Sequence, residues 1–429
     1  MSVQAVERRS SPLAAFRGYN FRLFFAGQLV SQAGGWMQKV GQAWLVLELT
    51  HSPFALGTVV SLQALPILCG TLFASVIVDR VPKHRLLLIT QALALVQASL
   101  LAWLTVSGSI QLWQIYVLAA FLGTINAFDS PGRLAFLMEL VGREKVVNAV
   151  GLSSAVENGA RLLGPAFAGL VIALWGVGVC FGLNAVSFLA VLTALLCMRR
   201  GDFLALPAPH HTGRRIVAQL GEGLRFVFGV RELVTVLIVL GGIGCFGYNF
   251  NTIVPLLAEQ GLHLGADGFG LLMSAVGIGA VIGAVAVASM GPATHKRILI
   301  AGLAFGAVEL TLSQTPVFAT AFVQLAMLSF CGMVFSTSCN SMLQLGAPNE
   351  LRGRVMGLYT MAMAGTSPIG ALLTGTLTSA FGIRTTLAAW GSMCALAALC
   401  ALGYKLRGPS LRPALMSAVD PIAAGSQPL

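Results

Sequence analysis

The chain has 429 residues, of which 56% are hydrophobic and only 10% are charged, and its formal net charge is +11. About a quarter of the residues in a soluble protein are Asp, Glu, Lys or Arg. This composition therefore excludes a soluble protein and predicts one that crosses a membrane many times. The eight cysteines form no CxxC or Cys/His cluster, so we expect neither a metal site nor a disulfide framework.

Twelve apolar runs are long enough to cross a membrane as helices, which takes about 20 residues each. They lie at 22–48, 54–78, 86–106, 112–128, 147–174 and 177–198, and then at 232–257, 268–290, 298–314, 317–339, 355–379 and 383–404. In runs of this kind, only helices satisfy their own backbone groups in lipid. We predict an all-α membrane protein with twelve transmembrane helices in two pseudo-symmetric six-helix bundles.

The polar segments complete the predicted organisation. The predicted parts are a cytoplasmic N-tail at 1–20, an N-terminal bundle at 21–198, a cytoplasmic linker at 199–231, a C-terminal bundle at 232–404 and a cytoplasmic C-tail at 405–429. From Ile216 to Val227, apolar residues recur on one helical face. This pattern predicts an amphipathic helix in the linker, lying on the membrane surface.

Basic residues indicate the orientation of the spans. All but four of the 26 Lys and Arg lie in tails and loops that would share one side of the membrane. The exceptions are Arg22, at the start of the first apolar run on that same side, and Lys39, Arg161 and Arg384. Loops rich in Lys and Arg stay in the cytoplasm. Both chain termini are therefore predicted to be cytoplasmic.

The fifth span carries Glu157 and Arg161 near its middle. Because the two residues are four apart with the acid first, they share a helical face and suit an ion pair. Glu157 would lie about 13 to 15 Å into the bilayer, where charges usually carry function. Protonation would release the pair, which makes both residues the first candidates for proton coupling. The alternative is a structural ion pair that fixes helix packing.

Spans 9 and 1 also contain polar or charged residues. Glu309, about 16 Å into span 9, is the second candidate for proton coupling, and its alternative role is that of a lone acid at a polar helix contact or an outer cavity. In span 1, Gln28, Gln32 and Lys39 form one polar stripe. The stripe would either face a cavity and attract an anionic substrate, or allow Lys39 to reach outward to the membrane surface.

The two halves of the sequence echo each other. Lys83-His84-Arg85 follows span 2, and His295-Lys296-Arg297 follows span 8. Pro165 in span 5 is matched by Pro368 in span 11. Parallel six-helix repeats place a substrate site between the halves near the membrane midplane.

The loop after span 2 reads Asp79-Arg80-Val81-Pro82-Lys83-His84-Arg85. It resembles the loop 2–3 signature of the major facilitator superfamily, from which it departs at Ser75, Val78 and Pro82. An acid at a helix end followed by bases suits a charge lock against neighbouring helix ends. The cytoplasmic gating candidates are Asp79, Arg80, Lys83, Arg85, Asp129 and Arg133. The alternative is an ordinary basic loop.

A second set of segments narrows the resemblance. The chain opens with Asn20-Phe21-Arg22-Leu23-Phe24 and later has Asp129-Ser-Pro131-Gly-Arg133 and Asn158-Gly-Ala-Arg161-Leu-Leu-Gly164-Pro165. These segments are similar to the branch of the superfamily that contains the enterobactin exporter and related secretion transporters. The resemblance implies alternating access and proton-coupled export. Gly164-Pro165 also resembles the helix-packing motif that antiporters have in span 5, although Ala168 departs from it.

The resemblance also implies which residues face the substrate, because spans 1, 4, 7 and 10 line the central path in the superfamily. The candidates are Gln28, Gln32, Trp36, Lys39, Asn126, Tyr248, Asn249, Asn251 and Ser336. Their alternative role is to form hydrogen bonds between helices. Many proton-coupled members carry an arginine in span 4, but the predicted span from Trp113 to Phe128 has no charge, so we expect the proton carrier elsewhere.

The predicted function is secondary active transport, as a proton-coupled exporter of a small amphipathic molecule that is siderophore-like or drug-like. The absence of nucleotide-binding and hydrolase motifs predicts that the chain is not an enzyme and needs no cofactor beyond a proton gradient. We expect a monomer in the bacterial inner membrane, in contact with lipid and a small-molecule substrate and with no nucleic acid. The alternatives are a lysophospholipid or lipid flipping transporter, and a non-transporting receptor or scaffold.

Overall fold

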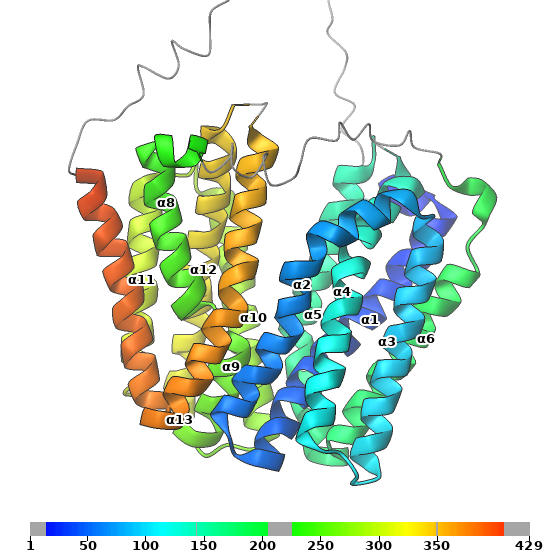
Figure 1. Ribbon diagram of the computed structural model, residues 1–429, viewed down its shortest axis with the longest axis horizontal. Helices are drawn as coiled ribbons and strands as arrows, with labels where there is room; N and C mark the ends of the chain where they lie inside the picture. Colours follow the sequence, from blue (N-terminus) through cyan, green and yellow to red (C-terminus); the bar gives the residue numbers. More distant parts are fainter. Residues whose placement is uncertain (1–13, 143, 205–224, 349–350, 407–429) are drawn as a thin grey trace, which may run out of the picture.

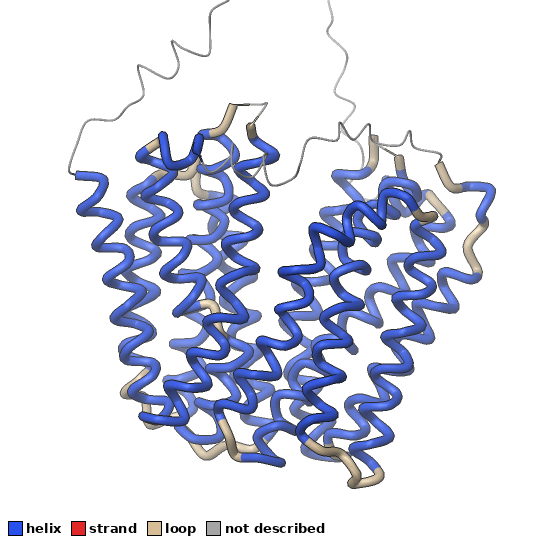
Figure 2. The backbone as a smooth tube through the Cα atoms, viewed as in Figure 1, coloured by secondary structure: helices blue, strands red, loops and turns tan. Residues whose placement is uncertain are grey.

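The computed structural model describes residues 14–142, 144–204, 225–348 and 351–406, and every regular element within them is a helix. The helices gather into two groups (Figures 1 and 2). The N-terminal group contains η1 (Ala14–Arg17), α1 (Tyr19–Thr50), α2 (Pro53–Arg80), α3 (Lys83–Val106), α4 (Leu112–Val141), α5 (Val146–Trp175), α6 (Val177–Leu196) and η2 (Arg200–Asp202). The C-terminal group contains α8 (Arg231–Gly242), η3 (Ile243–Gly247), α9 (Phe250–Leu256), η4 (Leu257–Gly261), α10 (Ala266–Ser289), α11 (His295–Leu312), α12 (Phe318–Gly346) and α13 (Arg352–Leu406).

Nine helices in the described residues are long and apolar enough to cross a membrane. The helix α1 is not among these nine because its polar stripe lowers its mean hydropathy. The helix α11 is not among them because its 18 residues include three charged ones, Lys296, Arg297 and Glu309. The helix α13 is two spans joined at Gly382, whose φ of 81° interrupts the helical backbone. With these three allowances the described residues contain the twelve predicted spans.

The fourth span is longer than the sequence predicted. We expected it to end at 128 and to be followed by a loop at 129–146, whereas α4 continues to Val141 and includes Pro131. A proline is tolerated inside a transmembrane helix where neighbouring helices satisfy the freed backbone groups. The expectation that span 4 carries no charge was therefore wrong, since Asp129 and Arg133 belong to the same helix.

The seventh span is discontinuous rather than one helix. Its first part, α8, passes into the π-helical turn η3, and Tyr248 and Asn249 have non-helical backbone before α9 begins. The Nδ2 of Asn249 donates to the carbonyl oxygen of Cys245 at 2.6 Å. This bond uses one of the backbone groups that the break would otherwise leave unpaired in the membrane.

The two groups meet at one end of the molecule, the closed end, where α1 ends and α2 begins. They diverge toward the opposite end, the open end, where α2 ends and α3 begins (Figures 1 and 2). At the closed end α2 packs on α13 and α5 packs on α10. A Cβ at Gly169 would lie 2.7 Å from the carbonyl oxygen of Ala266, so the contact requires a glycine. Small residues of this kind let membrane helices approach closely.

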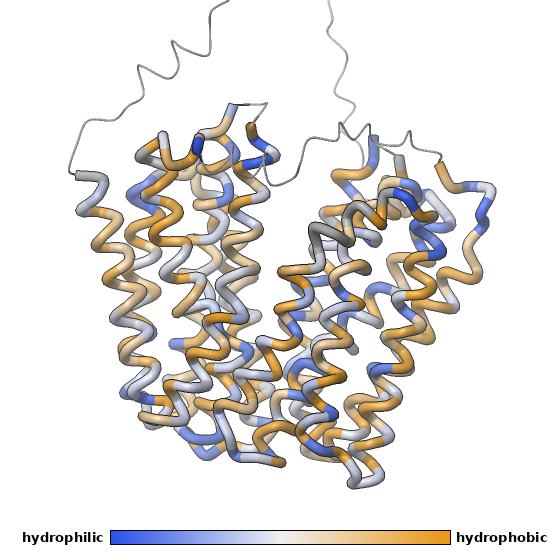
Figure 3. Tube along the Cα trace, in the orientation of Figure 1, coloured by the Kyte–Doolittle hydropathy of each residue, from blue (hydrophilic) through white to orange (hydrophobic). Residues whose placement is uncertain are grey.

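Hydrophilic residues gather near the helix ends, and they also occur at mid-height in the N-terminal group (Figure 3). The predicted tails and most of the predicted amphipathic helix lie outside the described residues, although 225–229 are helical. The mid-height polar residues are the ones that form the candidate site.

Candidate functional site

A cavity of about 360 Å³ lies within the N-terminal group, and side chains from α1 to α6 line it. Its volume falls in the roughly 300–1,000 Å³ range of small-molecule sites. Seven predicted site residues line it, namely Gln32, Trp36, Lys39, Asn126, Asp129, Arg133 and Glu157. The side chains of Lys39 and Glu157 are exposed to solvent although protein surrounds them, which shows that the cavity is open to water.

The indole ring of Trp36 is flanked by two cations. The Nζ of Lys39 lies 4.1 Å from the ring centroid, and the Cζ of Arg161 lies 5.5 Å from it. Both distances suit cation–π attraction. A Cβ at Gly164 would lie 2.7 Å from the Cβ of Trp36, so this glycine lets α5 approach α1 closely enough for the cluster to form. Pro165 is buried in the same stretch of α5.

The predicted ion pair between Glu157 and Arg161 does not form. Among the described residues, no carboxylate lies within ion-pair distance of Arg161, and its buried Nε has no hydrogen-bond partner. Arg161 lies over Trp36 instead, while Glu157 faces the cavity, where its charge acts on Lys39. Spacing on one helix predicts which side chains can meet, but a neighbouring aromatic ring offers the guanidinium a competing partner.

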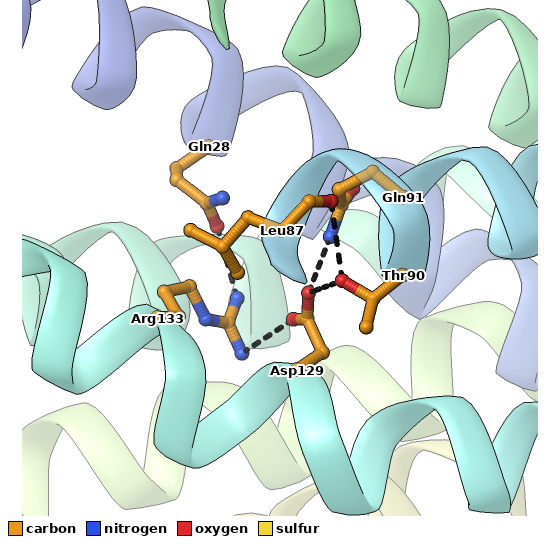
Figure 4. A network of polar contacts seen from close by, with 6 residues as sticks. All are labelled: Gln28, Leu87, Thr90, Gln91, Asp129 and Arg133. Atoms are coloured by element: carbon orange, nitrogen blue, oxygen red, sulfur yellow. Dashed lines mark hydrogen bonds and ion pairs between the residues drawn. The ribbon is translucent and has the colours of Figure 1, made fainter. Parts of the chain in front are cut away.

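Asp129 lies at the centre of a buried network that joins α1, α3 and α4 (Figure 4). Its Oδ1 accepts hydrogen bonds of 2.8 Å each from Thr90 Oγ1 and Gln91 Nε2. Its Oδ2 lies 3.8 Å from Arg133 Nη2, and Arg133 Nη1 donates to Gln28 Oε1 at 2.9 Å. Asp129 and Arg133 are therefore part of the cavity wall, not of the cytoplasmic loop to which the sequence assigned them. Gln28 contacts the cavity only through Arg133.

A second polar network lies beside the cavity, and the sequence reasoning missed it. The Nε2 of Gln38 donates to Gln97 Oε1 at 3.0 Å, and Asn184 Nδ2 donates to Gln38 Oε1 at 2.5 Å. These bonds join α1, α3 and α6. The sequence did contain a signal, because each of the three amides lies inside an apolar run. Gln63 and Gln91, which also line the cavity, carry the same signal.

The predicted substrate residues of the C-terminal group do not line this cavity. The hydroxyl of Tyr248 donates to the carbonyl oxygen of Gly332, and Asn249 bonds to its own helix. Asn251 is exposed, and the backbone oxygen of Ser336 accepts a bond of 3.3 Å from Tyr359.

Glu309 is also separate from the cavity. Its side chain is fully buried in α11, and neither carboxyl oxygen has a hydrogen-bond partner. The thiol of Cys394 on α13 lies beside the carboxyl group without the geometry of a hydrogen bond to either oxygen. The structure thus separates the two acids that the sequence proposed for proton coupling. Glu157 is exposed to solvent, and Glu309 is fully buried.

The predicted gating loop lies at the open end. Lys83 Nζ is 4.0 Å from Glu139 Oε1, which joins the start of α3 to α4. Arg80 and Arg85 are exposed, and the side chain of Asp79 lies outside the described residues. The described part of the chain holds no group of three His, Cys, Asp or Glu side chains that could bind a metal ion.

A family model described as transmembrane secretion effector matches residues 10–424. The chain is 28% identical over 413 residues to the multidrug efflux pump Tap of Mycobacterium tuberculosis, an alignment that covers 92% of this chain and 94% of that protein. It is 26% identical over 359 residues to the enterobactin exporter EntS of Escherichia coli, with 83% and 85% covered.

The fold is shared with solved transporters. A bacterial homolog of the human lysosomal transporter Spinster, in an inward-facing and unoccupied conformation, superposes with a TM-score of 0.71 at 11% sequence identity. The superposition covers 90% of this chain and 97% of that chain. At this identity the likeness establishes the fold alone. Together with the family match, it confirms the resemblance that the sequence motifs indicated.

Proposed function

The chain belongs to the transmembrane secretion effector family of the major facilitator superfamily, and we propose that it is a proton-coupled exporter of a small amphipathic molecule. Membership makes it a membrane transporter rather than an enzyme. The single observation that carries the proposal is the solvent-exposed cavity in the N-terminal group, which is lined by the carboxylate of Glu157, the cation of Lys39 and the ring of Trp36.

The asymmetry between the two ends supports transport by alternating access. The loops at the open end carry the basic residues, and the positive-inside rule assigns that end to the cytoplasm. The structure then corresponds to an inward-facing state in which substrate enters from the cytoplasm. Rocking the N-terminal group against the C-terminal group would close this end and separate the α2–α13 and α5–α10 contacts. An inner-membrane location with both termini in the cytoplasm is part of the same proposal.

The substrate class follows from the cavity wall. Trp36 offers an aromatic surface to the cavity, Lys39 lines the cavity beside it, and Arg161 lies near the ring without lining the cavity. Neither cation has a carboxylate within ion-pair distance among the described residues. A molecule with an apolar or aromatic part and a negative charge would pack on the Trp36 ring and be attracted by the charges of Lys39 and Arg161. Siderophore-like compounds meet this description, and so do acidic drug-like compounds. The similarity to an enterobactin exporter and to a multidrug efflux pump supports these two classes.

Proton coupling is assigned to Glu157 in preference to Glu309. A carrier must exchange its proton with water, and Glu157 is exposed to the cavity. Protonation would remove the negative charge that acts on Lys39, so the charge balance of the cavity would change with each proton taken up or released. Asp129 is a weaker candidate because its oxygens already accept two hydrogen bonds and lie beside Arg133.

The experiment compares a deletion strain with its parent by metabolite profiling of cells and medium, under iron limitation and iron repletion. Retention of a chelator inside the deletion cells would identify a siderophore, and a susceptibility panel of toxic compounds would identify a drug-like substrate. Export of the identified compound is then measured in energised inverted membrane vesicles. The Glu157→Gln variant should lose gradient-driven transport and keep substrate binding.

The matched control is Glu144→Gln, because Glu144 is exposed in the turn before α5 and does not line the cavity. This variant should transport like the parent protein. If Glu157→Gln kept the full dependence on the proton gradient, Glu157 would be excluded as the carrier. If the deletion changed neither metabolites nor susceptibility, export itself would be contradicted.

A further inference from the structure

A second hollow lies on the outer surface of the C-terminal group. It has a volume of about 410 Å³ and runs between α11 and α12 from the end of α10, with no residue in common with the cavity. Ile300 in its wall is 54% exposed. The helix α11 packs on α8, α12 and α13 of its own group and lies on the side of that group away from the N-terminal group (Figure 1). An exposed apolar surface on this outer side of a membrane protein faces lipid, so the groove is open to the bilayer.

One end of the groove is basic. Lys296 is exposed and Arg297 is half-buried at the start of α11. The Nη1 of Arg297 donates to the carbonyl oxygen of Gly291 at 3.0 Å, which holds the guanidinium beside the groove. In the described part of the chain, no carboxylate lies within ion-pair distance of either cation. Within the described ranges, these two positive charges therefore have no carboxylate to balance them.

The rest of the groove is apolar. Ile300 and Ala304 follow Lys296 at successive turns of α11, so the three share one helical face. Phe330 and Val334 of α12 form the opposite wall. From Lys296 to Ala304 the groove extends about 12 Å along the helix axis. Its charged end lies at the open end of the molecule, which the basic loops assign to the cytoplasm.

We propose that this groove binds one anionic phospholipid of the cytoplasmic leaflet. The phosphate lies against Lys296 and Arg297, and an acyl chain lies along Ile300, Ala304 and Phe330. Basic pockets between transmembrane helices on the cytoplasmic side suit anionic head groups. The two cations favour an anionic lipid over a neutral one. The apolar part of the groove favours a lipid over a free phosphate ion, because phosphate would leave the apolar side chains uncovered.

The test is native mass spectrometry of the full-length protein titrated with phosphatidylglycerol, with phosphatidylcholine, or with inorganic phosphate as a competitor. One phosphatidylglycerol should bind more tightly than phosphatidylcholine. Each basic residue near an anionic surface contributes about 1 kcal/mol, so Lys296→Gln with Arg297→Gln should weaken phosphatidylglycerol binding about 30-fold. Lys296→Gln alone, which keeps the Arg297–Gly291 bond, should weaken it about fivefold.

The charge-matched control is the double variant Lys145→Gln with Arg200→Gln, which removes two exposed bases from the N-terminal group and should bind the lipid like the parent protein. Thermal unfolding in phosphatidylcholine checks that the variants fold equally well. Equal binding of both lipids, or equal loss in the control and the groove variant, would overturn the proposal.

The apolar part of the groove needs its own variant. Ala304→Trp should fill the groove and reduce phosphatidylglycerol binding, whereas Val323→Trp, on the exposed face of α12 outside the groove, should not. If Ala304→Trp had no effect and inorganic phosphate displaced the lipid completely, the site would be an anion site and the lipid assignment would be wrong.

Discussion

The loops that follow α2 and α10 occupy equivalent places in the two groups, but their basic residues have different surroundings. In the N-terminal loop, Lys83 lies 4.0 Å from Glu139 of α4, and His84 Nε2 donates to the carbonyl oxygen of Leu195 at 2.9 Å. In the C-terminal loop, Lys296 and Arg297 have no carboxylate within ion-pair distance among the described residues. The first loop fastens three helices together, while the second presents its charges to the outside.

The buried acids of the two groups also differ in whether they have hydrogen-bond partners. Asp129 is buried and accepts two hydrogen bonds beside a guanidinium, whereas Glu309 is buried with no hydrogen-bond partner for either oxygen. The acid of the N-terminal group belongs to a hydrogen-bonded network beside the cavity, and the acid of the C-terminal group has no hydrogen-bond partner. Two halves with one topology can therefore divide their roles, and symmetry alone does not locate the site.

The largest expected effect comes from breaking the network of the N-terminal group. Asp129→Ala leaves Arg133, Thr90 and Gln91 without their common partner, and we expect a loss of about 3 kcal/mol in unfolding free energy. Asp129→Asn should recover part of this loss, because its amide oxygen still accepts two bonds. Unfolding in detergent, followed by circular dichroism, measures both variants.

Glu309→Gln provides the contrast in the C-terminal group. An amide replaces a carboxyl group that has no hydrogen-bond partner, so stability should stay the same or rise. A loss for Glu309→Gln as large as that for Asp129→Ala would show that the acid has a partner, and the contrast between the groups would fail.

The next largest effect is expected from the α5–α10 contact, which holds the two groups together at the closed end. A Cβ at Gly270 would lie 2.5 Å from the carbonyl oxygen of Pro165, so Gly270→Leu should destabilise the closed end by about 1–3 kcal/mol. A change of 1.4 kcal/mol alters a two-state ratio about tenfold. Spin labels at Arg85 and Ser289, on opposite groups at the open end, should then report a larger population with a short distance.

The control for this prediction is Gly151→Leu on α5, where no neighbouring atom lies within 4 Å of an added Cβ. It should leave the distance distribution unchanged. An unchanged distribution in Gly270→Leu would mean that the α5–α10 contact does not determine which end is open.

The sequence predicted an all-helical membrane protein and most of its span positions correctly, because long apolar runs are local properties. It ended span 4 too early, since Asp129, Pro131 and Arg133 together are typical of a loop. Their place inside a helix depends on Gln28, Thr90 and Gln91, which come from other helices. A linear pattern contains no information about such partners.

The same limit applies to the candidate site. Residues of α1, α4 and α5 line one cavity, but this cavity lies within the N-terminal group and not between the two halves, where the sequence repeat placed the site. The predicted Glu157–Arg161 pair did not form because Trp36 of another helix competes for the guanidinium. The predicted residues of span 7 were misplaced by the break at Tyr248 and Asn249, which no local motif announces. The buried amides Gln38, Gln97 and Asn184 were predictable in principle, since amides are costly in an apolar span unless they pair.

A smaller effect is expected from the cations of the cavity. Lys39→Gln removes one charge beside Trp36 while the side chain still reaches the cavity, and it should raise the KM for an anionic substrate about fivefold, which corresponds to roughly 1 kcal/mol. The control Lys145→Gln removes an exposed base outside the cavity and should leave KM unchanged. An equal effect on a neutral substrate would mean that Lys39 acts through packing and not through charge.

The smallest effect is expected at the closed end, where His51 Nδ1 lies 2.9 Å from Glu259 Oε1 and links the two groups. His51 is largely exposed, so His51→Ala should weaken the closure by less than about 1 kcal/mol. His263→Ala is the matched control, because both residues have left-handed backbone, with φ of 47° and 53°, and suffer similar strain on replacement. The distance distribution at the open end should shift slightly for His51→Ala only. A shift as large as that of Gly270→Leu would make this exposed pair, and not the glycine contact, the main closure between the two groups.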